Sequence, residues 1–180
     1  GVVGLGFGAA VHIPAFRKNK NVEVVVVAGT RAIKAKEVAK QFGIKGFSAG
    51  YQSILDFNLD IVSIALPPKQ NYEATQFFLE NKISVICEKP ISQNISEANN
   101  LVRMSKDIPN AVNFQFAELD AFKIAKKIIE DGELGKLQKI EIKWVTQSYA
   151  NKNKLDNWKR SILESGGVIS LLVTHCIYLL

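Results

Sequence analysis

Short apolar runs alternate with amphipathic stretches through the first 116 residues of the chain. The runs are rich in valine and isoleucine and nearly continuous, which is typical of strands buried on both faces of a parallel sheet. Each run is followed by a stretch whose apolar residues recur with helical spacing. This rhythm predicts an α/β fold with a doubly wound, Rossmann-type parallel sheet. The predicted strands are residues 2–3, 22–28, 46–48, 60–66, 83–87 and 111–116.

The pattern changes after residue 116. A helix is predicted over residues 121–130, and residues 138–147 then alternate apolar and polar side chains. A period of two with one polar face is typical of an open, mainly antiparallel sheet. We therefore expect a dinucleotide-binding Rossmann domain over residues 1–116 and the beginning of an α+β domain over residues 117–180. Because the chain lacks an initial methionine and stops within an apolar helix, we expect a fragment of a longer protein.

Composition and charge narrow the classes of partner. The chain is 47% hydrophobic and 22% charged, as ordinary globular proteins are, and its net charge is +6. Its lysines form no basic stripe, which argues against nucleic acid and favours an anionic small ligand. No uninterrupted apolar run reaches the roughly 18 residues of a membrane span. Two cysteines, Cys87 and Cys176, are too few for a disulfide framework or a zinc site. We expect a cytoplasmic protein with no membrane partner and no metal.

A glycine-rich segment follows the first strand and opens a helix. It reads Gly-Leu-Gly-Phe-Gly-Ala over residues 4–9, which fits G-x-G-x-x-A. In a dinucleotide site Gly4 would permit the tight turn, Gly6 would let the backbone approach a pyrophosphate, and Ala9 would let helix and strand pack. A glycine-rich turn that binds nothing has the same pattern. The candidate cofactor residues here are Gly4, Gly6, Phe7, Gly8 and Ala9.

The second strand ends in Thr30 and Arg31, where NAD-binding folds often carry an acid for the ribose hydroxyl. A carboxylate would repel a 2′-phosphate, whereas Thr30 and Arg31 could bind one. The sequence therefore favours NADP(H), with NAD(H) as the alternative.

The strand over residues 83–87 stops in Glu88, Lys89 and Pro90. Ligands of open α/β sheets bind beyond the carboxyl ends of the strands, so a lysine fixed there could take part in chemistry. The alternative is a turn that carries two solvated charges. We also predict a cis peptide bond between Lys89 and Pro90.

The last predicted helix carries Leu171, His175 and Tyr178 on one face. A single histidine on an apolar helix is either a packed core residue or a catalyst. The polar segment before this helix, residues 147–160 with Trp158, is either a loop over the cofactor cleft or an exposed connection.

The ordered set of motifs resembles the Gfo/Idh/MocA family of nicotinamide-dependent oxidoreductases, over essentially the whole chain. The motifs are residues 4–9, 64–68 (Ile-Ala-Leu-Pro-Pro), 87–90 (Cys-Glu-Lys-Pro), 128–135 and Gly166-Gly167 followed by His175. The resemblance implies that Leu66, Pro67, Asn71 and residues 88–90 bind the cofactor and that Lys89 and His175 are catalytic. It also implies hydride transfer to or from a secondary alcohol carbon of a sugar, cyclitol or sugar nucleotide, and a dimer or tetramer formed through a C-terminal sheet beyond this chain.

Three positions depart from the family pattern. Leu171 and Tyr178 stand where the family commonly has aspartates near the histidine, and Asn71 stands where many members have a histidine. With Trp158, Leu171 and Tyr178 are the candidate substrate contacts. The loss of an acid beside His175 favours a second hypothesis, a sensor that binds NAD(P) or sugar without turnover. A structural subunit that binds no nucleotide is the third.

Overall fold

The structure, a computed structural model, describes residues 1–179. It contains two compact units, unit 1 from Gly1 to Asn113 and unit 2 from Phe114 onward. The domain boundary expected after residue 116 lies close to this division. Leu180, the last residue of the predicted C-terminal helix, lies outside the described residues.

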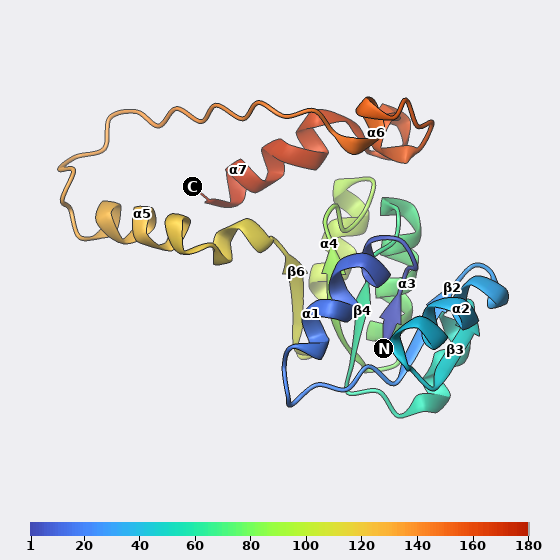
Figure 1. Ribbon diagram of the computed structural model, residues 1–180. Helices are drawn as coiled ribbons and strands as arrows, with labels where there is room; N and C mark the ends of the chain where they lie inside the picture. The colour runs from blue at the N-terminus through green and yellow to red at the C-terminus, as the bar shows by residue number, and fades with distance from the viewer. Residues whose placement is uncertain (180) are drawn as a thin grey trace. The chain divides into compact units, whose positions relative to one another are not determined.

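Unit 1 is built on a six-stranded sheet in which all neighbouring strands are parallel (Figure 1). The strand order is β3-β2-β1-β4-β5-β6, so the order reverses between β1 and β4. This is the doubly wound Rossmann-type sheet that the sequence predicts. The strands are β1 (Val2–Val3), β2 (Val26–Gly29), β3 (Gly46–Ala49), β4 (Ile61–Ile64), β5 (Ser84–Glu88) and β6 (Asn110–Asn113).

Both faces of the sheet are covered by helices, which is why the strands are apolar on both faces. Because successive strand side chains point to opposite faces, Val3 packs in one core cluster and Val2 in the other. The Val3 cluster includes residues of α3 (Pro68–Glu80) and α4 (Ile95–Met104). The Val2 cluster includes residues of the segment Gly8–His12, α1 (Ile13–Arg17) and α2 (Ala32–Phe42).

Three predicted strands are longer than the observed ones, and one of them is residues 60–66, where β4 covers only Ile61–Ile64. Residues 22–28 are predicted as a strand, but β2 begins at Val26, where its edge partner β3 begins with Gly46. Residues 111–116 are predicted as the last strand, but β6 ends at Asn113, opposite Glu88 at the end of β5. Strand ends depend on the reach of the partner strand, which composition alone does not encode.

Unit 2 contains α5 (Asp120–Glu130), α6 (Tyr149–Lys152) and α7 (Thr174–Leu179). Among the described residues no strand forms over the predicted range 138–147, which is an extended segment after α5 (Figure 1). This corrects the sequence prediction for that range. A strand needs a neighbour to take up its backbone hydrogen bonds, and no segment between residues 114 and 179 pairs with it. The open antiparallel sheet stays a prediction.

One apolar stretch, Ile162–Leu179, is long enough to cross a membrane by length and composition, with a mean hydropathy of 1.6 over 18 residues. The stretch contains Glu164, Ser165 and His175, so it is not an uninterrupted apolar run and does not contradict the sequence expectation. The structure interrupts it: Ser165 and Gly167 have φ values of 61° and 88°, and a short 3-10 turn precedes them. A membrane span needs a continuous hydrogen-bonded helix, so the stretch is weak support for a span.

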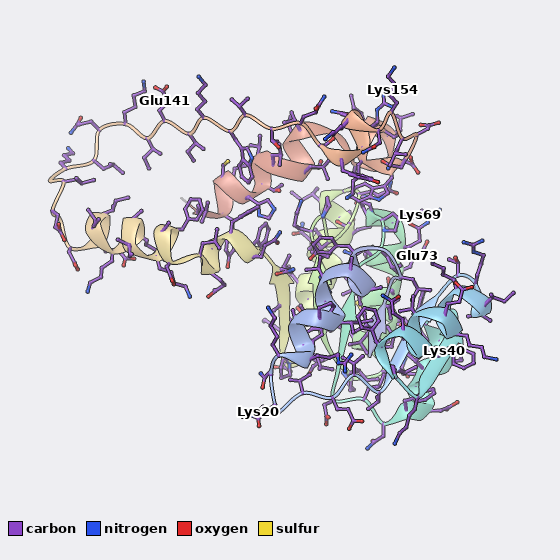
Figure 2. The ribbon with its side chains drawn as sticks, in the orientation of Figure 1. Lys20, Lys40, Lys69, Glu73, Glu141 and Lys154 are labelled. Atoms are coloured by element: carbon purple, nitrogen blue, oxygen red, sulfur yellow. The ribbon has the colours of Figure 1, made fainter. Side chains whose placement is uncertain are left out.

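The charged side chains of unit 1 are dispersed over its surface. Lys20, Lys40, Lys69 and Glu73 are all exposed, and Figure 2 labels them on different parts of unit 1, with Lys69 and Glu73 one turn apart on α3. The net positive charge is therefore not gathered on one helix.

Candidate functional site

The candidate site lies at the carboxyl ends of β1 and β4, where the strand order reverses and where ligands of open α/β sheets bind. Gly4 follows β1 directly, and its amide donates a hydrogen bond to the Ala28 carbonyl of β2 at 2.9 Å. Leu66 and Pro67 follow β4 and are half-buried. These predicted cofactor residues are thus brought to one edge of the sheet.

The glycine turn has the geometry that a dinucleotide requires. Gly4 has φ +108°, and a Cβ there would lie 2.2 Å from the Ala65 carbonyl oxygen. A Cβ on Gly6 would meet no protein atom within 4 Å, so the backbone at Gly6 is open to a ligand. Gly8 packs closely on Val2, since its Cβ would lie 3.1 Å from the Val2 Cγ1.

A helical segment begins at Gly8, and no side chain caps its first amides. Such amides bind phosphate oxygens well. Ala9 is buried against the sheet, whereas Phe7 is 40% exposed beside the turn. The residues present therefore fit the pyrophosphate of a dinucleotide cofactor.

Thr30 and Arg31 lie beyond the end of β2, and both are exposed. Arg31 has extended backbone geometry, with φ −127° and ψ 121°, and precedes α2. The first turn of α2 contains no acidic residue. This end of β2 can therefore accept an additional negative charge.

The side chain of Asn71 in α3 hydrogen-bonds to the backbone of the turn that carries Lys89. The Asn71 Nδ2 donates to the carbonyl oxygens of Glu88 at 2.5 Å and of Pro90 at 3.1 Å. The Lys89–Pro90 peptide bond is cis, which confirms the sequence prediction. Asn71 is fully buried and supports the turn; its predicted contact with a cofactor stays a prediction.

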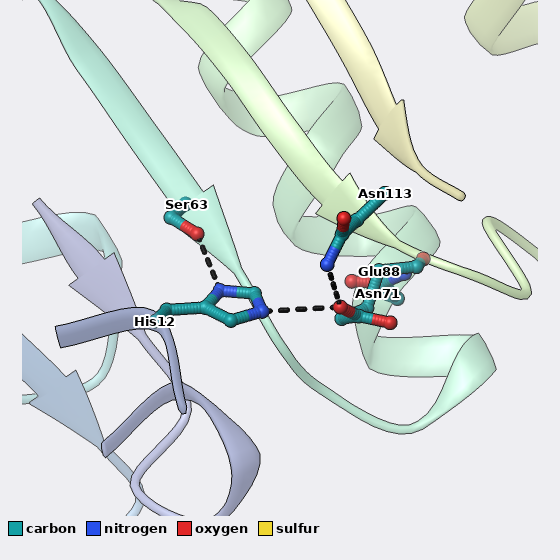
Figure 3. Close-up of polar contacts among 5 residues, drawn as sticks. All are labelled: His12, Ser63, Asn71, Glu88 and Asn113. Carbon is teal, nitrogen blue, oxygen red and sulfur yellow. Dashed lines mark hydrogen bonds and ion pairs between the residues drawn. The ribbon is translucent and has the colours of Figure 1, made fainter. Parts of the chain in front are cut away.

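Glu88 lies in a buried polar cluster that sequence reasoning missed (Figure 3). The His12 Nε2 is 3.0 Å from the Glu88 Oε1, and the His12 Nδ1 is 2.6 Å from the Ser63 Oγ. The Asn113 Nδ2 donates to the same Glu88 oxygen at 2.5 Å. The interpretation of Glu88 as a solvated turn charge is therefore wrong, whereas Lys89 beside it is half-buried. The sequence feature that could have revealed this cluster is His12, a histidine on the buried face of the helix that follows the glycine turn.

Cys87 precedes this cluster on β5 and is not a nucleophile. Burial raises the pKa of its thiol to about 11, and the nearby Glu88 charge acts in the same direction, while a hydrogen bond with Thr75 opposes both. A thiol with that pKa is almost entirely protonated at neutral pH and therefore unreactive.

In unit 2, His175 is 2% exposed and packed among aromatic rings. Its ring centroid lies 4.6 Å from Phe116, 5.8 Å from Phe114 and 6.2 Å from Trp144. Tyr178 stacks on Phe114 at 4.2 Å and is 56% exposed. His175 and Lys89 belong to different units, so their convergence on one substrate stays a prediction.

The other candidate substrate residues also lie in unit 2. Leu171 is half-buried in the helical segment Ile169–Val173 before α7. Trp158 begins the 3-10 turn Trp158–Arg160, and a Cβ on Gly166 would lie 2.2 Å from the Trp158 carbonyl oxygen. Gly166 thus permits the close approach of this turn to the last helical stretch.

Within residues 1–179 no group of three or more histidine, cysteine, aspartate or glutamate side chains is arranged to hold a metal ion.

Known proteins resemble the chain in both sequence and structure. An uncharacterised oxidoreductase of Synechocystis is 30% identical over 97% of the chain and 48% of its own length. Levoglucosan dehydrogenase of Pseudarthrobacter phenanthrenivorans is 27% identical over 84% of the chain and 40% of its own length. A solved complex of levoglucosan dehydrogenase with NADH and levoglucosan superposes with a TM-score of 0.80 at 26% identity, over 99% of this chain and 51% of that one.

The chain thus spans about half the length of the relatives it matches. Residues 1–116, which include the glycine turn and the Glu88–Lys89–Pro90 turn, match the family described as "Oxidoreductase family, NAD-binding Rossmann fold". The resemblance inferred from the motifs is confirmed, and the chain belongs to the Gfo/Idh/MocA family of oxidoreductases.

Proposed function

We propose that the protein transfers a hydride between NAD(P) and a secondary alcohol or ketone carbon of a sugar, cyclitol or sugar nucleotide. The observation that carries the proposal is the arrangement at the switch point of the sheet. There a glycine turn open at Gly6 lies beside strand ends that include the half-buried Lys89. The existence of a levoglucosan dehydrogenase among the relatives supports a polyhydroxylated substrate.

In this proposal the chain supplies position and a proton route. A bound nicotinamide would supply the hydride acceptor or donor. The turn amides hold the pyrophosphate, Lys89 orients the reacting substrate oxygen, and His175 exchanges the proton of that oxygen. Leu171 has no carboxylate to accept a hydrogen bond from His175, and the rings of Phe114 and Phe116 pack against the histidine.

The test is turnover by the full-length protein. With NADH or NADPH and a panel of ketosugars and oxidised cyclitols, we expect substrate-dependent loss of nicotinamide absorbance. Cofactor binding by calorimetry with no turnover on the whole panel would instead support the sensor hypothesis, which Leu171 and Tyr178 favour. Absence of any NAD(P)H binding would contradict the oxidoreductase proposal, and absence of sugar binding as well would leave the structural-subunit hypothesis.

For the choice of cofactor we propose NADP(H) over NAD(H). The exposed Arg31 and Thr30, with no acid in the first turn of α2, can take a 2′-phosphate. Arg31→Ala is expected to weaken NADPH binding about tenfold, the scale of one charge-assisted hydrogen bond, and to leave NADH binding unchanged. Calorimetric titration of both cofactors measures this. NADH binding as tightly as NADPH to the unaltered protein would remove the role given to Arg31.

We further propose a cytoplasmic homo-oligomer, a dimer or tetramer formed through a C-terminal sheet beyond this chain, with a small-molecule polyol or sugar as substrate and no nucleic-acid or membrane partner. Sedimentation of the full-length protein tests the oligomer.

A further inference from the structure

We propose that His12 is a positioning residue: together with Asn113 it holds the Glu88 carboxylate and thereby fixes the orientation of Lys89, the next residue along the chain. The proposal rests on the proposed function for its kinetic consequence, but its structural consequence can be measured without turnover. No role in the hydride transfer itself is assigned to His12.

The Glu88 carboxylate is held by two donors from different elements. Figure 3 shows His12 and Asn113 meeting at one oxygen, the Glu88 Oε1, at 3.0 Å and 2.5 Å. An ionised carboxylate only accepts hydrogen bonds, so both contacts are charge-assisted donations, from the His12 Nε2 and the Asn113 Nδ2. With 12% of the Glu88 side chain exposed, water competes little for this oxygen.

The His12 ring is itself fixed in rotation. Both ring nitrogens have partners: the Nε2 faces the Glu88 carboxylate, and the Nδ1 lies 2.6 Å from the Ser63 hydroxyl, which can donate or accept according to the tautomer. The rings of Phe7 and Phe16 pack against it with centroid distances of 5.4 Å and 6.3 Å. His12 therefore presents one defined donor to Glu88.

This arrangement joins two parts of the proposed site through one side chain. His12 ends the helical segment Gly8–His12, which follows the open Gly6 backbone almost directly. The carboxylate that it holds belongs to the residue before Lys89. A change at the glycine turn is thus transmitted through His12 to Glu88 and to the lysine. Catalytic groups tolerate little displacement, since a misplacement of about 1 Å can cost ~10²-fold in rate.

Two substitutions separate this role from packing. Asparagine matches the Nδ1 position of histidine, so His12→Asn can keep the Ser63 contact but withdraws the donor from Glu88. Glutamine reaches the Nε2 position, so His12→Gln can keep the donor to Glu88. If His12 only filled space between Phe7 and Phe16, His12→Asn and His12→Gln would not differ in their effect on Lys89.

The first readout is the reactivity of Lys89 toward trace acylation, followed by mass spectrometry on the full-length protein without cofactor. His12→Asn is expected to raise the Lys89 labelling rate about fivefold, the scale of one net hydrogen bond lost from the turn. His12→Gln is expected to recover most of this change. The exposed Lys69 of α3 serves as the internal control, and its rate is expected to stay constant.

The second readout is kinetic. His12→Asn is expected to reduce kcat at least ~10-fold with a smaller effect on the NADPH dissociation constant, because a displaced Lys89 acts on the reacting oxygen. In a Lys89→Ala background the same substitution is expected to cause no further loss, since the group that it positions is gone.

If His12→Asn does not fold, Asn113→Ala tests the same positioning of Lys89. Asn113 is half-buried at the end of β6, so its replacement is expected to leave the fold intact. We expect it to raise Lys89 labelling in the same direction. Unchanged Lys89 labelling in both variants, or equal effects of His12→Asn and His12→Gln, would overturn the proposal. A wild-type protein without turnover would refute the proposed function and leave the labelling result valid.

Discussion

Replacing Lys89 with alanine is expected to reduce turnover by about 10²–10⁴-fold, the usual range for a side chain that assists proton transfer. Lys89 follows β5 at the carboxyl edge of the sheet, and Asn71 holds the carbonyls on either side of it at 2.5 Å and 3.1 Å. The turn is therefore supported by Asn71 and does not depend on the lysine side chain. Steady-state loss of NADPH absorbance with the best ketosugar substrate measures the effect.

The matched control is Lys89→Arg. Arginine keeps the charge but carries a larger planar group that cannot take the position of the compact ammonium beside the reacting oxygen, so Lys89→Arg is expected to bind NADPH normally and still lose most of the turnover. For both variants the NADPH dissociation constant should stay within about threefold of the wild-type value, since a role in the chemical step mainly lowers kcat. If Lys89→Ala turned over at the wild-type rate, the role given to this lysine would be refuted.

The core of unit 1 was predictable because its strands are buried on both faces. Val2, Val3 and Val26 occur in short apolar runs, and such β-branched runs alternating with helical patterns are typical of a sheet covered by helices on each side. The position of the glycine turn was equally accessible, since Gly4 and Gly6 follow a strand and precede a helix. These features depend on residues close together in the sequence.

The features that the sequence did not reveal depend on distant residues. His12 lies 51 residues from Ser63 and 76 residues from Glu88, and it occupies a helix position that an apolar residue would suit as well. The alternating segment after α5 was predicted as a strand because its local period is right. Whether it pairs depends on a partner strand, which its own pattern cannot specify.

Substitutions in the glycine turn are expected to give the second large effect. Gly4→Ala should reduce the stability of the fold, whereas Gly6→Ala, two residues later, should reduce cofactor binding. Gly4→Ala is expected to destabilise the protein by about 3 kcal/mol or more, because φ is +108° there and the new Cβ would lie 2.2 Å from the Ala65 carbonyl oxygen. The Ala65 backbone cannot yield easily, since Ala65 follows β4 at the centre of the sheet and its amide donates to the Val3 carbonyl at 2.8 Å. Urea unfolding of the full-length protein measures the loss.

Gly6→Ala is expected to behave in the opposite way. A Cβ on Gly6 meets no protein atom within 4 Å, so stability should change by no more than about 0.5 kcal/mol. The same methyl group would occupy the space through which a pyrophosphate approaches the backbone, and NADPH binding should weaken by about 10–100-fold, or roughly 1.4–2.8 kcal/mol. If the turn binds nothing, Gly6→Ala should change neither the free energy of unfolding nor the affinity for NADPH. Calorimetry on this variant therefore distinguishes a dinucleotide site from a glycine-rich turn, and equal NADPH affinity in Gly6→Ala and wild type would contradict the binding role of the turn.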